Sequence, residues 1–239
     1  MSASAPFGSP RLHLRLTDST NTRARELAVA GAPHGMLVTA SEQSAGRGRQ
    51  GRTWTAPAGS SLLCSVVVRD PPPLASLIAG VAAAEAIGSE AQLKWPNDVY
   101  VDRRKVAGIL VEGRPQERWG IIGVGVNVAV APDAFPPELA GRAGTLGWGP
   151  DAIEPLLTSL LGALERWLAA PREDMLEAVR ARDALLGQTL TWAGGTARGA
   201  GIDEHGRLVV DTGEGRQALN AGEVHLGGLG GPAADQLVP

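Results

Sequence analysis

The sequence predicts an α+β fold: a mixed or antiparallel β-sheet with helices packed on it, followed by a small β-barrel module. Short apolar segments joined by turns fill most of residues 35–128 of the 239-residue chain, a spacing that favours hairpins. Helical patterns cover residues 153–185. After Gly187, five short alternating segments follow within about forty residues, which is typical of a small barrel.

The first half of the chain alternates strand and helix patterns. Capping residue types at 18–21 precede a short helix at 22–30. A second helix is expected over 74–87, where apolar residues have helical spacing. Strands are expected at 12–16, 35–40, 61–68, 91–95, 98–102, 105–112 and 119–128.

The second half divides at Gly187. Helices are expected at 153–169, where leucines form one stripe, and at 172–185. The short strands beyond are expected at 189–192, 196–202, 208–210, 217–219 and 223–226. We therefore predict a flexible tail (1–11), a main domain (12–186), a small β module (187–226) and a disordered tail (227–239) rich in Gly, Pro and Ala.

Composition narrows the class of protein. A hydrophobic fraction of 44% supplies a sizeable core, and a net charge of −3 gives no overall positive field for nucleic acid. The single cysteine, Cys64, lies in an apolar run and is expected to be a buried thiol in a reducing compartment. The N-terminus lacks an apolar signal-peptide core, and no apolar run approaches a membrane span, so we expect a cytoplasmic protein.

Lysine is rare in this chain. Of 22 basic residues only Lys94 and Lys105 are lysine, and they are eleven positions apart. Lysine and arginine are not interchangeable where a compact, movable ammonium meets a carboxylate or phosphate oxygen. The two lysines are therefore candidates for chemistry, against the alternative of chance survival on a surface loop.

An arginine- and glycine-rich segment spans residues 46–52. It has no apolar side chain, so it cannot bury itself in a core. Glycine permits close backbone approach to a ligand, and arginine supplies forked donors for carboxylate or phosphate. The segment lacks the P-loop pattern. A small-anion site, an RNA contact and a solvated loop all remain open for the segment by itself.

The block Lys94-Trp95-Pro96-Asn97-Asp98 is more specific. A Trp-Pro pair in strand-like sequence forces a strand end and leaves Asn97 and Asp98 at a turn. Lys, Asn and Asp together fit a nucleotide and its Mg²⁺, although an ordinary Asx turn is the commoner fate of Asn-Asp. Lys105 should lie on the adjacent strand end, and Gly108 would leave room beside the sheet for a ligand.

The run GVGVN (123–127) is not a dinucleotide loop, because it lacks the third glycine and no helix follows. Two glycines in a strand mark the close approach of another group. Asn127 at the strand end is a turn residue or a ligand contact. The four histidines show no metal-ligand spacing.

Taken in order, five blocks resemble the biotin protein ligases. They are DSTN (18–21), EQSAGRGRQGRTW (42–54), KWPND (94–98), KVAGILVE (105–112) and GVGVN (123–127). The likeness spans residues 12–226 and implies a class II synthetase-like catalytic domain with an SH3-like C-terminal domain. It implies an enzyme that joins biotin and ATP, with Mg²⁺, into biotinyl-5′-AMP. A lysine of a biotin carrier protein then takes the biotin and releases AMP.

The resemblance also implies roles for residues. The catalytic residues would be Lys105, Asp98 and Arg49. The biotin contacts would be Ser19, Thr20, Asn21, Gln43, Gly46, Arg47, Gly48, Arg49, Lys105 and Gly108. The nucleotide contacts would be Arg47, Arg49, Arg52, Trp54, Lys94, Asn97 and Asn127. No residue is assigned to a metal, since Mg²⁺ would arrive with the ATP phosphates. We expect residues 46–52 to be mobile when empty and to order over the ligand.

Two features depart from many relatives. Only 17 residues precede Asp18, too few for the helix-turn-helix domain of the bifunctional relatives, so no DNA binding is expected. Ala221 stands where the family often has glycine. The expected partner is the biotin carboxyl carrier protein of acetyl-CoA carboxylase, and the expected state is a monomer or weak homodimer.

Three alternatives stay open. A lipoate or octanoate ligase or transferase would share the catalytic fold. An RNA-binding module would use residues 46–52, but aromatic residues for base stacking make up only 4% of the chain. A biotin-binding regulator without catalysis would not need Lys94, Asp98 and Lys105.

Overall fold

The computed structural model describes residues 6–220 and 224–226, and it confirms the α+β class. The main sheet has seven strands in the order β1-β2-β5-β9-β8-β7-β6. Their bounds are β1 Arg11–Leu14, β2 Leu37–Ala40, β5 Ser61–Arg69, β6 Gln92–Lys94, β7 Asp98–Val101, β8 Arg104–Arg114 and β9 Trp119–Asn127. β1 and β2 are parallel, and the other neighbours are antiparallel, so the sheet is mixed as predicted.

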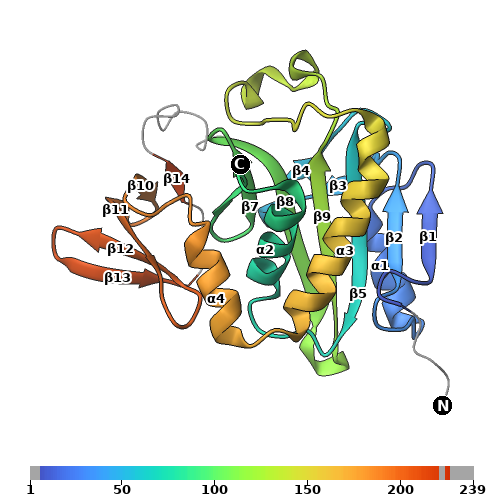
Figure 1. The fold of residues 1–239 in the computed structure, drawn as a ribbon, viewed down its shortest axis with the longest axis horizontal. Coiled ribbons are helices and arrows are strands. Elements are labelled where there is room, and N and C mark those ends of the chain that lie inside the picture. Colours follow the sequence, from blue (N-terminus) through green and yellow to red (C-terminus); the bar gives the residue numbers. More distant parts are fainter. Residues whose placement is uncertain (1–5, 221–223, 227–239) are drawn as a thin grey trace.

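Helices cover both faces of this sheet (Figure 1). One face carries α1 (Thr20–Val29), which packs its alanines on Val38, Val67 and Ile121. The other face carries α2 (Ala75–Ile87) and α3 (Ile153–Ala169) over the larger core. Side chains of β5 and β9 point alternately into the two helical layers, which is why both faces of these central strands are mostly apolar.

Helix α2 is buried along nearly its whole length, between the sheet and α3. Its sequence is rich in alanine, and small side chains let the helix lie close to both neighbours. Helix α3 is amphipathic instead, with Leu156, Leu160 and Leu164 buried on the stripe that the sequence predicts.

The C-terminal module is a five-stranded antiparallel sheet in the order β13-β12-β11-β10-β14. Its strands are β10 Thr189–Trp192, β11 Gly195–Ile202, β12 Leu208–Thr212, β13 Gly215–Leu219 and β14 His225–Leu226. The five expected strands are therefore present. The module lies beside α4 (Arg172–Ala181), at the left of Figure 1.

Helix α4 is shorter than the predicted 172–185. The chain leaves the helix to pair with the sheet: the Leu93 N–H donates to the Arg182 carbonyl at 2.7 Å, and Ala184 N–H donates to the Leu93 carbonyl at 2.8 Å. The Asp183 carboxylate also accepts from the Leu185 N–H at 2.8 Å. These bonds replace the last helical turn and attach the linker to β6.

The N-terminal segment differs from the expected flexible tail of residues 1–11. The Gly8 N–H donates to the Gly35 carbonyl at 2.9 Å, and the Phe7 ring lies 5.4 Å from the ring of His34. Arg11 belongs to β1 and pairs with Glu154 on α3 at 2.7 Å. Packing thus begins before residue 11. Residues 1–5 and the predicted disordered tail 227–239 lie outside the described residues, as does Ala221.

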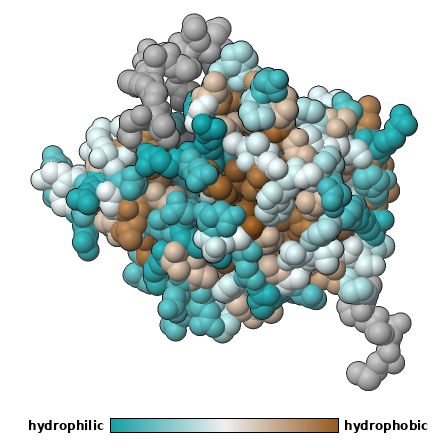
Figure 2. Space-filling view, turned by 45° about the horizontal axis from the view of Figure 1, so that its top comes forward, coloured by the Kyte–Doolittle hydropathy of each residue, from teal (hydrophilic) through white to brown (hydrophobic). Residues whose placement is uncertain are grey.

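The surface seen from the upper side of Figure 1 is uneven in polarity. Figure 2 shows hydrophobic residues gathered in a hollow at the middle of this face, with hydrophilic residues around them. In the part of the chain that the structure describes, no helix has the length and apolar character needed to cross a membrane.

Candidate active site

The candidate residues come from five places that the sheet brings together. They are the start of α1, the segment after β2 with its small hairpin, the turn between β6 and β7 with its flanking residues, the first half of β8, and the end of β9. The hairpin and the start of α1 lie on the same face of the sheet, because Trp54 and Asn21 both contact glycines of β9 whose side-chain positions face that way.

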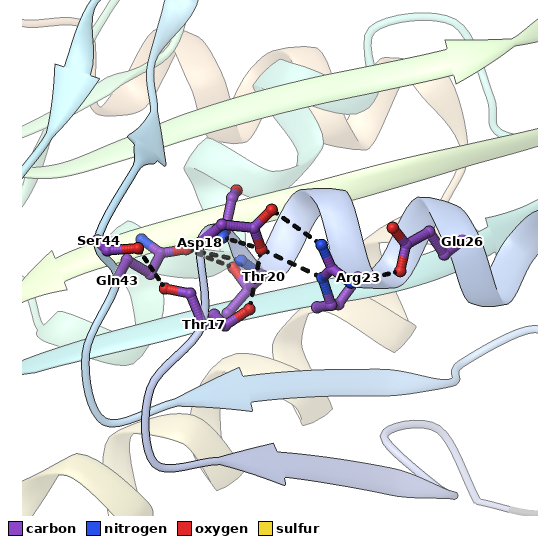
Figure 3. A network of polar contacts seen from close by, with 8 residues as sticks. Thr17, Asp18, Thr20, Arg23, Glu26, Gln43 and Ser44 are labelled. Carbon is purple, nitrogen blue, oxygen red and sulfur yellow. Dashed lines mark hydrogen bonds and ion pairs between the residues drawn. The ribbon is translucent and has the colours of Figure 1, made fainter.

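The start of α1 is fixed by a polar network (Figure 3). Gln43 Oε1 accepts from the Thr20 N–H at 2.7 Å and from its hydroxyl at 3.1 Å. The Asp18 carboxylate accepts from the Ser19 N–H at 2.7 Å and pairs with Arg23 at 2.9 Å. The Arg23 guanidinium and the Ser19 N–H lower the pKa of Asp18 to about 2. Two blocks that are more than twenty residues apart thereby form one rigid corner.

Asn21 is buried behind this corner. Its Oδ1 accepts from the Ser65 hydroxyl at 2.6 Å, and its Nδ2 donates to Glu112 Oε2 at 2.8 Å and to the Leu110 carbonyl at 3.4 Å. A Cβ on Gly123 would lie 2.0 Å from Asn21 Oδ1. Position 123 therefore requires glycine, because a side chain there would occupy the space of the Asn21 amide. With both amide hydrogens engaged, Asn21 braces the site rather than presenting donors.

Residues 46–54 form a small hairpin rather than an open loop. β3 (Gly46–Arg47) pairs with β4 (Thr53–Trp54), and a 3₁₀ turn, η1 (Arg49–Gly51), connects them. A Cβ on Gly46 would lie 2.3 Å from the Trp54 carbonyl oxygen, so the tight pairing requires glycine there. The predicted mobility of residues 46–52 stays a prediction.

Two arginines attach the hairpin to the sheet. Arg47 pairs with Glu112 Oε1 of β8 at 3.0 Å. Arg49 donates to Asn97 Oδ1 at 2.8 Å, and Asn97 in turn donates to the Ile109 carbonyl at 3.0 Å. Arginine's planar fork suits such directional contacts with oxygen acceptors.

Trp54 packs on two neighbouring glycines of the sheet. Gly108 and Gly125 are register partners on β8 and β9, and a Cβ on either would meet the indole at 3.0 Å or 2.7 Å. The expected close approach to glycine strands is therefore made by Trp54 and Asn21. The space beside Gly108 is shared by Trp54 and the Lys105 side chain, whose ammonium is 5.8 Å from the indole centroid.

Asp98 lies between the two lysines. Its Oδ1 is 2.6 Å from Lys105 Nζ, and its Oδ2 is 4.0 Å from Lys94 Nζ. Lys94 and Asp98 face each other across β6 and β7, and Asp98 faces Gly108 across β7 and β8. Asp98 and Lys105 lie on adjacent strands, but the prediction of adjacent strand ends is wrong, because Lys105 faces Tyr100 beside the β7–β8 turn and Asp98 is at the other end of β7. One carboxylate is thus shared by two ammonium groups.

A segment that sequence reasoning missed crosses the ends of β8 and β9. The Lys105 N–H donates to the Arg142 carbonyl, and the Gly144 N–H donates to the Lys105 carbonyl, each at 2.8 Å. Asn127 Nδ2 donates to the Gly144 carbonyl at 2.9 Å. Asn127 therefore holds this segment beside Lys105, and its nucleotide contact stays a prediction.

Charges from this segment reach Tyr100 on β7. Burial raises the pKa of the Tyr100 phenol, and nearby Asp98 raises it further, while Arg142 and Arg52 act in the opposite direction. The Arg142 and Arg52 guanidinium groups thus lie close enough to Tyr100 to lower the pKa of its phenol. No motif pointed to Arg142, because its approach depends on the fold of residues 129–150.

Two other expectations concern Cys64 and metals. Cys64 is buried, and burial raises the pKa of its thiol to about 12, so it is an inert core thiol. Among residues 6–220 and 224–226, no group of three or more His, Cys, Asp or Glu side chains gathers as a metal site.

Comparison with known proteins identifies the family. Residues 13–127 match the biotin/lipoate A/B protein ligase family, and residues 177–227 match the biotin protein ligase C terminal domain. A biotin–[acetyl-CoA-carboxylase] ligase of Paracoccus denitrificans is 37% identical over 90% of this chain and 100% of the relative. The chain belongs to the biotin protein ligase family. A second such ligase, from Mycobacterium tuberculosis, is 34% identical over 88% of this chain and 86% of its own.

Solved structures of the family have the same fold. Biotin protein ligase from Aquifex aeolicus in complex with biotin and ATP is 27% identical, with a TM-score of 0.77 over 91% of this chain and 98% of that one. Biotin protein ligase from Leishmania major in complex with biotinyl-5-AMP is 25% identical, with a TM-score of 0.63 over 89% of this chain and 99% of that one.

Proposed function

We propose that this chain is an ATP-dependent ligase that makes biotinyl-5′-AMP and transfers the biotin to a lysine of a biotin carrier protein domain. The observation that carries the proposal is the group of Lys94, Asp98 and Lys105, with the hairpin held beside it through Arg49 and Asn97. The family match over most of the chain supports the same reaction.

The first step brings a carboxylate to a polyphosphate. Two unit charges 4 Å apart repel by about 4 kcal/mol at an effective dielectric of 20. Lys105 supplies a cation at the point of attack, and Lys94, Arg49 and Arg52 supply others for the phosphates. Lys94 and Lys105 lie on either side of Asp98, and both ammonium groups would stabilise the charge on the pentavalent phosphate.

The biotin side needs neutral hydrogen-bonding groups for the ureido ring. Ser19, Thr20 and Gln43 form the fixed corner that would supply them, together with backbone at Gly46 and Gly48. Trp54 was expected at the nucleotide. Because Trp54 lies on Gly108 next to Lys105, we expect it to contact the ligand where biotin joins the AMP group. Its buried indole N–H has no hydrogen-bond partner among the described residues.

Magnesium fits as a companion of ATP rather than as a resident ion. The nearby oxygen donors are the Asp98 carboxylate and the Asn97 amide, and Mg²⁺ is commonly held by one carboxylate plus substrate phosphates. Bound there, the ion would neutralise charge on the departing pyrophosphate.

In the second step, a carrier lysine attacks the anhydride carbonyl and AMP leaves. Asp98 would orient the incoming lysine and accept a proton from its ammonium, so that the neutral amine attacks; its carboxylate already holds the Lys105 ammonium at 2.6 Å. The carrier of acetyl-CoA carboxylase is the proposed acceptor because the relatives' names specify that carboxylase. We further propose a cytoplasmic monomer or weak homodimer that does not bind DNA.

Mass spectrometry after incubation with biotin, ATP and Mg²⁺ tests the first step directly. Biotinyl-5′-AMP should appear with biotin, and lipoate or octanoate should give no adenylate. The family model covers lipoate enzymes as well, so this comparison of acids is the deciding one. An adenylate formed with lipoate and not biotin would overturn the proposal. Strongly salt-dependent RNA binding without adenylate would favour the RNA-binding alternative.

A further inference from the structure

Glu112 joins two parts of the candidate site through its two carboxylate oxygens. Oε1 lies 3.0 Å from Arg47 Nη2 on the hairpin, and Oε2 accepts from Asn21 Nδ2 on α1 at 2.8 Å. The side chain is 24% exposed, so these contacts are partly shielded from water. Charge-assisted contacts of this kind are stronger than neutral hydrogen bonds.

The two partners of Glu112, Asn21 and the hairpin, are held in place by different contacts. Asn21 is further held by Ser65 and the Leu110 carbonyl, so it is immobile. The contacts of the hairpin include its own β3–β4 pairing, Trp54 on the sheet and the Arg49 bond to Asn97. Glu112 lies on β8, an interior strand of the main sheet. The Glu112 contact therefore links the hairpin directly to an interior strand and to the start of α1.

We propose that Glu112 is a positioning residue that fixes Arg47, and with it the hairpin, against the biotin side of the site. It acts through Arg47 and Asn21 and not by touching substrate. The inference rests on the proposed function, because the hairpin matters for activity only if biotin binds beneath it. Removing the carboxylate should raise the cost of ordering the hairpin when biotin binds.

Steady-state kinetics of biotin-dependent adenylate formation provides the first test. Glu112→Ala should raise the KM for biotin about 10- to 100-fold while changing kcat less than about threefold, as for loss of a hydrogen bond to a charged group. Glu112→Gln keeps an acceptor for Asn21 but loses the charge facing Arg47, so its KM should rise about three- to tenfold.

A matched control is Glu117→Gln. Glu117 also pairs with an arginine, Arg114, at 2.8 Å and also accepts a second hydrogen bond, from the Trp119 indole, but it lies in the 3₁₀ turn after β8. This variant should leave the KM for biotin within about twofold of the parent protein. A similar rise in both variants would show that only general surface charge matters and would overturn the inference.

Trypsin cleavage reports on the hairpin without any need for activity. The hairpin offers cleavage sites after Arg49 and Arg52, and Glu112→Ala should be cut there about 10-fold faster than the parent protein or Glu117→Gln. Unchanged cleavage, or a fall in kcat with unchanged KM for biotin, would refute a positioning role. A parent protein that makes no biotinyl adenylate would refute the proposed function, while the cleavage result would still decide the contact.

The pair itself is tested by a double-mutant cycle with Arg47→Ala. If Glu112 acts through Arg47, the effects of the two changes on hairpin cleavage should be less than multiplicative. Fully independent effects would overturn the coupling. Urea unfolding of each variant checks for global loss of structure. We expect none, because the Asn21 bonds to Ser65 and Leu110 remain in all of them.

Discussion

The two sides of the site are built by opposite means. At the start of α1, Thr20, Gln43 and Ser65 hydrogen-bond one another or their neighbours and are shielded by the sheet. On the other side, the Lys94 and Lys105 ammonium groups both lie close to the Asp98 carboxylate. The first side holds its shape before a ligand binds, and the second holds charged groups in place before a ligand binds. A neutral ring system needs hydrogen-bonding groups that are already in position, and a polyphosphate needs positive charges that are already in position.

The largest effect should come from Lys105→Ala at the charged side. Loss of one preorganised cation costs about 100- to 1,000-fold in rate, so adenylate formation should fall by that factor. Stability should change little, because the Lys105 side chain is 30% exposed. Mass spectrometry of the adenylate and urea unfolding check the two halves of this statement. A normal yield of adenylate would show that the charge at this turn is not used.

The shaped side should respond to added bulk rather than to lost charge. Gly123→Ala places a Cβ 2.0 Å from Asn21 Oδ1, so the variant should lose about 1–3 kcal/mol of unfolding free energy together with biotin affinity. Gly162→Ala on α3 is the control, because a Cβ there meets nothing within 4 Å. It should be neutral or stabilising. Equal stability of both variants would contradict the close packing inferred for Asn21.

A third variant tests how much stability is added by a hydrogen bond between the charged side and the C-terminal module. Trp95 Nε1 donates to the Gly206 carbonyl at 3.1 Å, and Trp95 is the neighbour of Lys94. Trp95→Phe leaves that buried carbonyl without its donor and should cost about 1–2 kcal/mol of unfolding free energy. Urea unfolding measures the cost. Unfolding at the parent protein's midpoint would mean that the bond adds no net stability.

The smallest effect concerns Asp18, whose pKa is lowered to about 2 from an ordinary value of 3.8. A depressed folded-state pKa gives stability that is present above pH 3.8 and is lost as pH falls through about 2. Because the carboxylate is 42% exposed, solvent screening keeps the contribution below about 1 kcal/mol. Asp18→Asn should therefore be slightly less stable at pH 7.

The difference between Asp18→Asn and the parent protein should shrink as pH is lowered and vanish below pH 2, where both side chains are uncharged. Thermal unfolding across this pH range is the measurement. A difference that stays constant down to the lowest pH would assign the effect to geometry and not to charge.

Patterns local in sequence predicted much of this molecule. The apolar runs of β5 and β9, the strand end at Trp95-Pro96 and the five strands after Gly187 all follow from adjacent residues. The pairing of the strands that carry Asp98 and Lys105 was predictable as well, because β7 and β8 are joined by a tight turn. Local rules of pattern and turn chemistry are strongest where neighbours in sequence are neighbours in space.

What the sequence did not predict depends on contacts between distant segments. Trp54 lying on Gly108 and Gly125, Arg142 beside Lys105, and Glu112 between α1 and the hairpin each need the folded sheet. One of these regions left a signal: Ser65 interrupts an apolar strand, and a buried hydroxyl implies a polar partner. That partner proved to be α1, through Thr20 and Asn21.

The linker beside β6 has a consequence for self-association. A sheet border offers unsatisfied amide and carbonyl groups on which a foreign strand can grow, and proteins protect such borders against aggregation. Here the N–H and C=O of Leu93 are already occupied by residues 182 and 184. The border next to Lys94 is therefore closed to strand addition at this point, and detachment of residues 182–184 would expose unpaired backbone groups of β6 beside the candidate site.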